Sequence, residues 1–167
     1  MEEVYELRVR AWAFHQPLFS SAGGRWTDAY DEVAAHFVIT KESDVVAAAR
    51  YTIHDRATDG PDGEVYVGVG TEHVLPPIAV ISRLVVCPRH SKRGLSDFLD
   101  NVRIEHARQR GCRSVLVCTS SGSARLRQLQ EIGFRQLYQA ASQVAGPLEG
   151  TPPPTVMALP ISQSHAV

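Results

Sequence analysis

The stretch IAVISRLVVCPRHSKRGLSDFLDNVRIEHA, residues 78–107, decides the fold. Its first part, residues 78–86, is almost entirely apolar, and such a run of Val and Ile indicates a strand covered on both faces. Pro88 ends this strand. Apolar residues then recur at helical spacing from Leu95 to Gly111. The predicted order is strand, basic turn, helix.

The turn between the strand and the helix is rich in positive charge. It contains Arg89, His90, Lys92 and Arg93 and ends at Gly94. The first amide groups of a helix lack internal partners and lie at the positive end of its dipole, so they can hold a phosphate group. Basic side chains nearby would add a screened attraction. The local pattern fits a solvated basic loop equally well, so the surrounding sequence has to decide.

That surrounding sequence, RLVVCPRHSKRGLSDFL, resembles the acyl-CoA loop of the GNAT superfamily of N-acyltransferases. The family pattern is Arg or Gln, two residues, Gly, one residue, then Gly or Ala. Laid on residues 91–96, it retains Gly94 and has the small residue Ser96 at its end, while Ser91 replaces the usual Arg or Gln.

Two later segments carry the same resemblance. SVLVC at residues 114–118 resembles the family's fifth strand, and LRQLQEIGF at residues 126–134 resembles its last helix with the Gly-Phe that follows. The resemblance implies an α/β fold with a mixed, mostly antiparallel central sheet of about six to seven strands. Helices would cover both faces, and two central strands would splay apart. We expect one such domain over residues 1–167.

The resemblance also implies a cofactor site, because the pantetheine arm of acyl-CoA lies between the splayed strands in this family. The backbone of Leu84, Val85 and Val86 would pair with pantetheine as an added strand does. The pyrophosphate would be held mainly by main-chain N–H groups of the turn, namely those of Arg89, His90, Ser91, Lys92, Arg93, Gly94, Leu95 and Ser96. The implied co-substrate is acetyl-CoA or another acyl-CoA, and no metal is expected.

The usual proton carriers of the family are replaced. Members often have a Glu on the fourth strand as base, and here Val80 and Ile81 stand at the comparable positions. They often have a Tyr four residues before the Gly of the last helix as acid, and here that residue is Leu129. The candidate substitutes are Ser82, Tyr138 and His54, followed by His73 and Ser123. A packing or surface role is the alternative for each of them.

Three functions follow from these observations. The first is transfer of an acyl group from acyl-CoA to the primary amine of a small molecule or amino acid. The second rests on ISRL at residues 81–84, DAYD at residues 28–31 and Ala35-His36, which resemble the autoinducer synthases and related N-acyl amino acid synthases. Those enzymes use acyl chains on CoA or on acyl carrier protein, which the basic turn would dock. The third is an acyl-CoA-binding regulatory module without catalysis.

Composition narrows the class of protein further. A chain of 167 residues with 44% apolar residues suits one domain. A formal net charge of −1 gives no reason to expect nucleic acid or an anionic membrane as a partner. No apolar run is long enough to span a membrane, and Met-Glu-Glu does not begin a signal peptide. The three cysteines fit no metal-binding spacing and are typical of thiols in a reducing compartment. We expect a cytoplasmic monomer or homodimer.

The N-terminal part of the chain predicts two helices and a hairpin. Val4, Leu7, Ala11 and Phe14 share one face of a helix over residues 2–14. A short helix capped by Thr27 follows, with Asp28 and Asp31 as helix-end charges. Residues 36–40 and 45–54 read as paired strands, and Arg50 at the end of Ala-Ala-Ala-Arg reads as an ion-pairing residue.

The rest of the chain contains one long connection and a C-terminal hairpin. Residues 55–77 are rich in Gly, Asp and Pro and read as a flexible insertion that could cover the substrate, with strand character only at residues 65–69. Residues 134–144 and 155–161 are expected to pair as strands around a Pro-rich turn. Residues 162–167 are expected to be a loose tail.

Overall fold

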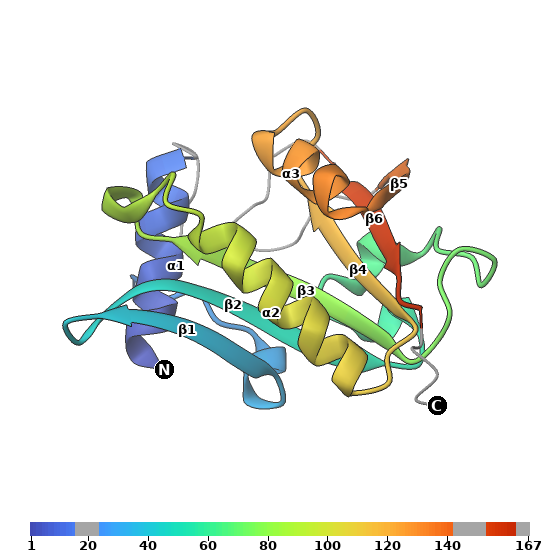
Figure 1. Cartoon of the computed structure of the whole chain (residues 1–167), viewed down its shortest axis with the longest axis horizontal. Helices are drawn as coiled ribbons and strands as arrows, with labels where there is room; N and C mark the ends of the chain where they lie inside the picture. Colours follow the sequence, from blue (N-terminus) through green and yellow to red (C-terminus); the bar gives the residue numbers. More distant parts are fainter. Residues whose placement is uncertain (16–23, 142–152, 163–167) are drawn as a thin grey trace.

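One sheet forms the centre of the computed structural model, which describes residues 1–15, 24–141 and 153–162. The described strands are β1 (Ala35–Lys41), β2 (Asp44–His54), β3 (Ile78–Val86), β4 (Ser114–Thr119), β5 (Arg135–Gln139) and β6 (Thr155–Pro160). They lie in the order β1-β2-β3-β4-β6-β5 (Figure 1). Every neighbouring pair is antiparallel except β3 and β4, which are parallel.

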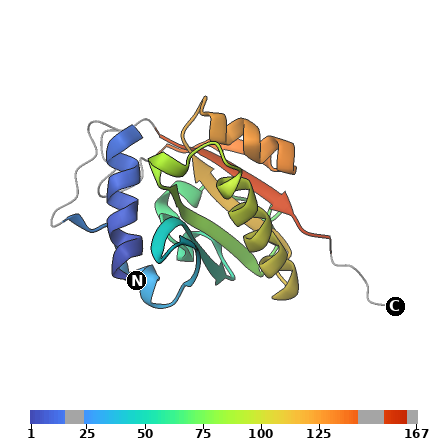
Figure 2. The same ribbon diagram turned by 60° about the vertical axis from the view of Figure 1, so that its left-hand side comes forward.

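Helices cover both faces of this sheet, as Figure 2 shows. On one face lie α1 (Glu2–His15) and the short 3-10 helices η2 (Ala29–Glu32), η3 (Ala57–Asp59) and η4 (Gly63–Tyr66). On the other face lie α2 (Leu95–Gln109) and α3 (Ala124–Ile132). Successive β3 residues alternate accordingly: Val80 packs with Val65, whereas Ile81 packs with Ile104. The predicted fold class is confirmed.

The first helix packs as its sequence pattern predicts, except at its end. Val4, Leu7 and Ala11 are buried against Ala48 of β2 and Val85 of β3. Phe14 was predicted on the same face but is 69% exposed. It lies in the last turn of α1, beyond the buried Ala11. The chain enters α1 directly after Met1, so no described strand precedes this helix.

The two central strands pair only at their beginnings. The parallel ladder joins Ile78–Val80 to Ser114–Leu116 and then ends, although both strands continue. On its other side β3 stays paired with β2 up to Val86, across a register shift at which Arg83 has a φ of 51°. The strands β3 and β4 therefore diverge beyond Val80, as the splayed arrangement requires.

Several local predictions were wrong. The segment predicted as a strand at residues 65–69 is occupied at its start by η4, a 3-10 helix. The cap of the short helix is Asp28 and not Thr27. The Asp28 carboxylate accepts a hydrogen bond from the Tyr30 amide, and the Asp31 carboxylate accepts one from the Asp28 amide. That helix is a single 3-10 turn.

The insertion and the C-terminal hairpin complete the fold. The insertion at residues 55–77 contributes Val65, Tyr66 and Val74 to the core, each with at most 2% of its surface exposed. The strands β5 and β6 pair as predicted. The remainder of the first predicted strand from residue 142, nearly all of the Pro-rich turn, and the tail from residue 163 lie outside the described residues.

Candidate active site

The turn between β3 and α2 leaves a row of backbone amides available. Its first part is the 3-10 helix η5 (Pro88–His90), in which the amides of His90 and Ser91 donate to Cys87 O and Pro88 O at 2.8 and 3.3 Å. The amides from Lys92 to Ser96 have no acceptor among the described residues. They lead into the N-terminus of α2, so they lie where a helix attracts an anion.

The backbone of this turn is shaped by two residues with positive φ. Lys92 has a φ of 59°, and Gly94, which precedes the first residue of α2, has a φ of 74°. As the N-cap residue, Gly94 has no side chain with which to accept a helix amide. A left-handed residue is most easily supplied by glycine, and a Cβ built at Gly94 would meet nothing within 4 Å. The space where a Gly94 side chain would stand is therefore open.

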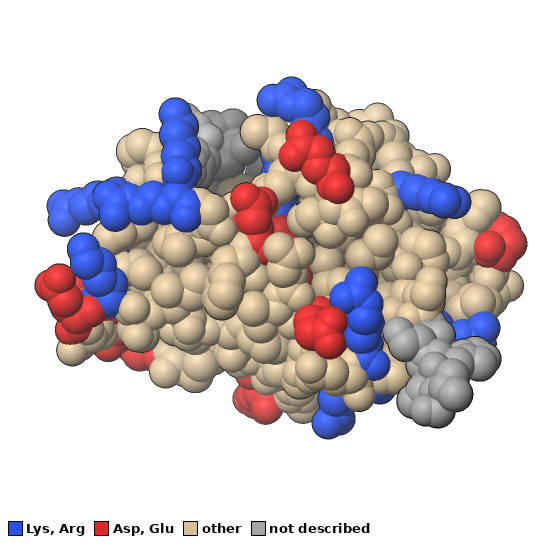
Figure 3. Space-filling model, in the orientation of Figure 1, with Lys and Arg blue, Asp and Glu red and all other residues tan. Residues whose placement is uncertain are grey.

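Basic side chains belong to the same turn as these amides. Arg89, Lys92 and Arg93 are exposed, and His90 is half-buried. Figure 3 shows Lys and Arg side chains projecting from this corner of the molecule, over the turn and the neighbouring end of α1. Exposed cations on flexible stems contribute a screened attraction for phosphate, whereas the backbone amides supply direction.

The strand before the turn offers a second backbone surface. Cys87 N donates to Val46 O on β2 at 2.8 Å, and successive residues of a strand point their amides to opposite edges. The N–H and C=O of Val86 therefore point away from β2, towards the side where the ladder to β4 has ended. The predicted cofactor residues Leu84, Val85 and Val86 thus adjoin the turn at an unpaired strand edge.

The positions at which the family usually carries its proton-transfer groups are buried and apolar. Val80 and Ile81 have 0% and 1% of their surface exposed, and Leu129 has 0%. Val80 packs with Leu116 in the core on the α1 face, while Ile81 and Leu129 pack in the core beneath α2 and α3. These side chains serve packing, so any proton transfer must use other groups.

The three candidate substitutes lie in different places. Ser82 lies on β3 just beyond the end of the ladder to β4, and its Oγ accepts Arg50 Nε at 3.0 Å. The Tyr138 hydroxyl donates to Val65 O at 3.0 Å, and burial raises its pKa. His54 is paired with Ile78 at the closed end of the sheet, about 13 Å along the strand from the level of Ser82.

The remaining candidates have other surroundings. Burial lowers the pKa of His54, and its Nε2 is buried without a hydrogen-bond partner among the described residues. His73 is exposed beside Glu72, and the Ser123 hydroxyl caps α3 by accepting the Leu126 amide. Of all the candidates, Ser82 is the one on the open part of β3.

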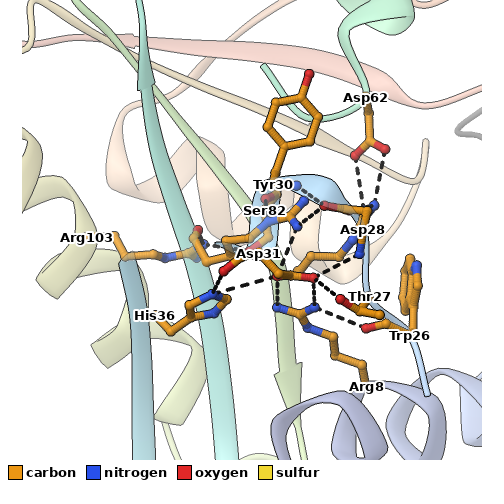
Figure 4. Close-up of polar contacts among 12 residues, drawn as sticks. Arg8, Trp26, Thr27, Asp28, Tyr30, Asp31, His36, Asp62, Ser82 and Arg103 are labelled. Atoms are coloured by element: carbon orange, nitrogen blue, oxygen red, sulfur yellow. Dashed lines mark hydrogen bonds and ion pairs between the residues drawn. The ribbon is translucent and has the colours of Figure 1, made fainter. Parts of the chain in front are cut away.

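A network of buried charges lies beside Ser82, and Figure 4 shows its members. Arg8 donates from both Nη atoms to the Asp31 carboxylate at 2.9 Å, and its Nη1 also donates to Trp26 O at 3.1 Å. Arg50 Nη1 donates to Asp28 Oδ1 at 2.5 Å and to Asp31 Oδ1 at 3.1 Å. These contacts join α1, η2 and β2 on one face of the sheet.

Arg83 extends the network to the inserted segment. Its Nη2 donates to Asp28 Oδ2 at 2.9 Å and its Nη1 to Asp62 Oδ2 at 3.1 Å. Its guanidinium carbon lies 4.5 Å from the Trp26 ring centroid, in cation–π range. The network therefore connects the inserted segment, at Asp62, to the open part of β3.

The charges in this network set the pKa values of its carboxyl groups. Burial alone would raise the pKa of Asp31, but hydrogen bonds from Arg8 and from the Asp28 amide, with the charges of Arg8 and Arg50, lower it strongly. Burial also raises the pKa of Asp28, but the hydrogen bond from Arg50 and the charges of Arg50 and Arg83 lower it by more, so the net pKa is lowered. Both groups are carboxylates at neutral pH.

A second pair of titratable groups lies on the same face. Tyr66 of η4 and Cys118 of β4 pack in the same core cluster, and Cys118 lies two residues beyond Leu116, the last residue of β4 that pairs with β3. Burial raises the pKa of Tyr66 well above its usual value and that of the Cys118 thiol to about 12. Both groups are neutral at physiological pH.

Sequence reasoning recognised only part of this site. It identified Arg50 as an ion-pairing residue, which the structure confirms, and interpreted Asp28 and Asp31 as helix-end charges. They do cap η2, but they also bind three arginines. The available sequence signal was the pair of Asp residues in segment 28–31 and the Arg in segment 81–84. That signal does not show that Arg8 and Asp62 belong to the same network.

The class of protein is now defined by its fold and by comparison. A sequence model of the acetyltransferase (GNAT) family matches residues 1–134. The chain belongs to the GNAT acetyltransferase family, in agreement with the divergence of β3 from β4 and the amide-lined turn. No curated protein matches the chain.

Solved structures share the fold at low sequence identity. The ribosomal-protein-S18-alanine N-acetyltransferase from Escherichia coli is 18% identical, with a TM-score of 0.63 over 98% of this chain and 89% of that one. Polyamine N-acetyltransferase from Drosophila melanogaster is 18% identical, with a TM-score of 0.64 over 95% of each chain. A CoA-dependent acyl-homoserine lactone synthase, BjaI, solved with SAM and isopentyl-CoA, is 18% identical, with a TM-score of 0.71 over 97% and 76%.

At 18% identity these likenesses establish the fold of the chain. They do not identify its acyl donor or its acceptor. In the part of the chain that the structure describes, none of the helices has the length and apolarity needed to cross a bilayer.

Proposed function

We propose that this protein is an acyl-CoA-dependent N-acyltransferase that acts on the primary amine of a small molecule or amino acid. The observation that carries the proposal is the row of amides from Lys92 to Ser96, none with an acceptor among the described residues, next to the outward edge of Val86. A diphosphate fits the first feature and a pantetheine amide fits the second.

The same geometry suggests how the chain assists the reaction. The amine nitrogen attacks the thioester carbonyl carbon, a C–N bond forms, and the C–S bond then breaks to release CoA thiolate. The outward N–H of Val86 would stabilise the negative charge on the carbonyl oxygen. The amine must lose a proton and the thiolate must gain one. Ser82 is the nearest side chain on β3 that could relay a proton, with its Oγ oriented by Arg50.

Binding and turnover can be tested separately. Isothermal titration should show CoA binding to the purified protein, and a thiol-reactive dye should report CoA release from acetyl-CoA across a panel of amines and amino acids. Binding together with amine-dependent thiol release supports the proposal. Absence of CoA binding would overturn it. The double variant Lys92→Ala, Arg93→Ala tests the side chains, and we expect it to weaken binding mainly at low salt.

A second candidate is an N-acyl amino acid or autoinducer-type synthase that takes longer acyl chains from CoA or acyl carrier protein. The Arg50 and Arg83 contacts with Asp28 favour it, because they involve the segments whose sequence resembles that subgroup. The fold likeness to BjaI is consistent with it. Faster turnover with octanoyl-CoA or octanoyl-acyl carrier protein than with acetyl-CoA would select this candidate.

The third candidate is an acyl-CoA-binding module without catalysis. It is favoured by the burial of Val80, Ile81 and Leu129, which leaves no carboxylate or phenol at the usual positions. CoA binding with no thiol release above background on any amine would support this candidate over both enzymes.

A further inference from the structure

The two diverging strands lead into different helices, and one buried carboxylate connects those helices. The strand β3 leads through the basic turn into α2, whereas β4 leads into α3. Asp100 of α2 is completely buried, and its carboxylate accepts hydrogen bonds from both Nη atoms of Arg125 in α3. The distance from Nη2 to Oδ1 is 2.7 Å. A buried charge of this kind persists only where it is fully paired.

A second arginine ties the same carboxylate to the sheet. Arg103 Nη2 donates to Asp100 Oδ1 at 2.6 Å, and Arg103 Nη1 donates to Arg50 O at 3.1 Å and Ser82 O at 3.3 Å. Burial lowers the pKa of Arg103 to about 10, so the group is still charged at neutral pH. Asp100 is thus connected both to α3 and to the shifted register of β2 and β3, beyond the point where β3 and β4 separate.

A weaker contact repeats this connection nearer the turn. Gln128 of α3 donates to Ser96 Oγ at 3.3 Å and also bonds to Asp97. Ser96 contributes one of the amides without a described acceptor, so α3 contacts the residues at which the diphosphate would bind. Among the described residues, the ladder between β3 and β4 has already ended at Val80 and Leu116.

We propose that Asp100 is a positioning residue whose bridge from Arg103 to Arg125 sets the separation of β3 and β4, and so the width of the opening that receives the acyl-CoA thioester. This inference rests on the proposed acyl-CoA site. The bridge replaces, between the helices, the ladder that the strands lack. Loss of Arg125 leaves Asp100 paired with Arg103 but removes the connection of Asp100 to α3, so that only the weaker Gln128 contact remains between these polar groups.

The decisive variant is Arg125→Met, because Arg125 is at the margin of the buried site and Met preserves its apolar stem. We expect CoA affinity to fall about tenfold, since small displacements in a binding site are costly. Arg125→Lys, which retains one charged donor, should recover most of the loss. Arg108→Met is the matched control: it removes the exposed Arg108–Glu105 pair from the far end of α2 and should leave affinity unchanged.

A distance measurement separates positioning from simple stabilisation. Spin labels at the exposed positions Asn101 on α2 and Gln130 on α3, placed after Cys87 and Cys118 are replaced by Ser, report the separation of the helices by double electron–electron resonance. We expect Arg125→Met to broaden or shift the distance distribution and Arg108→Met to leave it unchanged. An unchanged distribution in Arg125→Met, or unchanged CoA affinity, would overturn the inference. If the wild-type protein does not bind CoA, the proposed function fails instead, whatever the spin labels show.

Discussion

Arg83 and Asp62 form a salt bridge, Nη1 to Oδ2 at 3.1 Å, although both residues have a left-handed backbone. Their φ angles are 51° and 57°. Each such conformation costs about 1–2 kcal/mol for a residue with a side chain. The pair joins the β3 register shift to the inserted segment and offsets part of that cost.

Asp62→Asn tests this relationship, because Asn tolerates the left-handed backbone but carries no charge. We expect the free energy of unfolding to fall by about 2 kcal/mol, since Arg83 is buried and keeps only Asp28 as an ionic partner. Urea unfolding measures the change. Asp59→Asn is the control: it removes an exposed pair with Arg56 and should have almost no effect. If both variants lost the same free energy of unfolding, the buried Arg83–Asp62 pair would contribute no more than an exposed pair, and the prediction would be wrong.

Asp31 predicts a pH dependence of stability. The folded protein holds the pKa of Asp31 well below its ordinary value of 3.8, so the contribution of Asp31 to stability is fully present above that value and is lost as the pH falls towards the folded pKa. Asp31→Asn should therefore be much less stable than the wild type at pH 6, by about 3 kcal/mol. The difference should shrink between pH 4 and pH 2 as the wild type loses stability. A difference that stays constant over this range would contradict the assignment.

The amide row predicts an unequal response to two substitutions in the turn. Ser91→Ala should leave CoA affinity unchanged. The Ser91 side chain makes none of the proposed contacts with the diphosphate, and the Ser91 amide already donates to Pro88 O. Gly94→Ala should weaken CoA binding and reduce stability by about 1 kcal/mol, because its φ is 74°. Gly111→Ala, with a φ of 73° at the other end of α2, should reduce stability similarly without affecting affinity. Titration calorimetry and urea unfolding distinguish these outcomes.

The positions of Ser82 and His54 predict different effects on turnover. Ser82→Ala should lower kcat by about tenfold or more if its hydroxyl relays a proton at the open part of β3. His54→Gln should leave kcat unchanged, because His54 pairs with Ile78 at the closed end. Steady-state thiol release measures both. A loss of kcat in His54→Gln with none in Ser82→Ala would reverse the proposed roles.

The sequence predicted those parts of the fold that depend on local periodicity. The nine apolar-rich residues of β3, the basic turn and the α2 pattern were correct because strand and helix spacing are properties of neighbouring residues. The C-terminal pairing of β5 with β6 followed from two such runs around a Pro-rich connection. The predicted strand at residues 65–69 failed because burial of Val65 and Tyr66 under β3 and β4 outweighs their strand propensity.

The charged site was less accessible to sequence reasoning. Arg8, Asp31 and Asp62 are far apart in the chain, and their pairing depends on how α1 and the insertion fold onto one face of the sheet. Asp100 and Arg125 resemble ordinary surface charges on two amphipathic helices, and only the packing of those helices shows that the carboxylate is buried.

The central claim is that backbone amides of the β3–α2 turn bind the diphosphate of CoA. The most direct measurement is a ¹⁵N–¹H NMR titration of the wild-type protein with CoA, with adenosine 5′-diphosphate, which carries a diphosphate, and with pantetheine, which carries none. We predict that the amides from Lys92 to Ser96 shift with CoA and with adenosine 5′-diphosphate but not with pantetheine, whereas Val86 shifts with CoA and pantetheine. If CoA binds while the amides from Lys92 to Ser96 keep their positions, the account is contradicted.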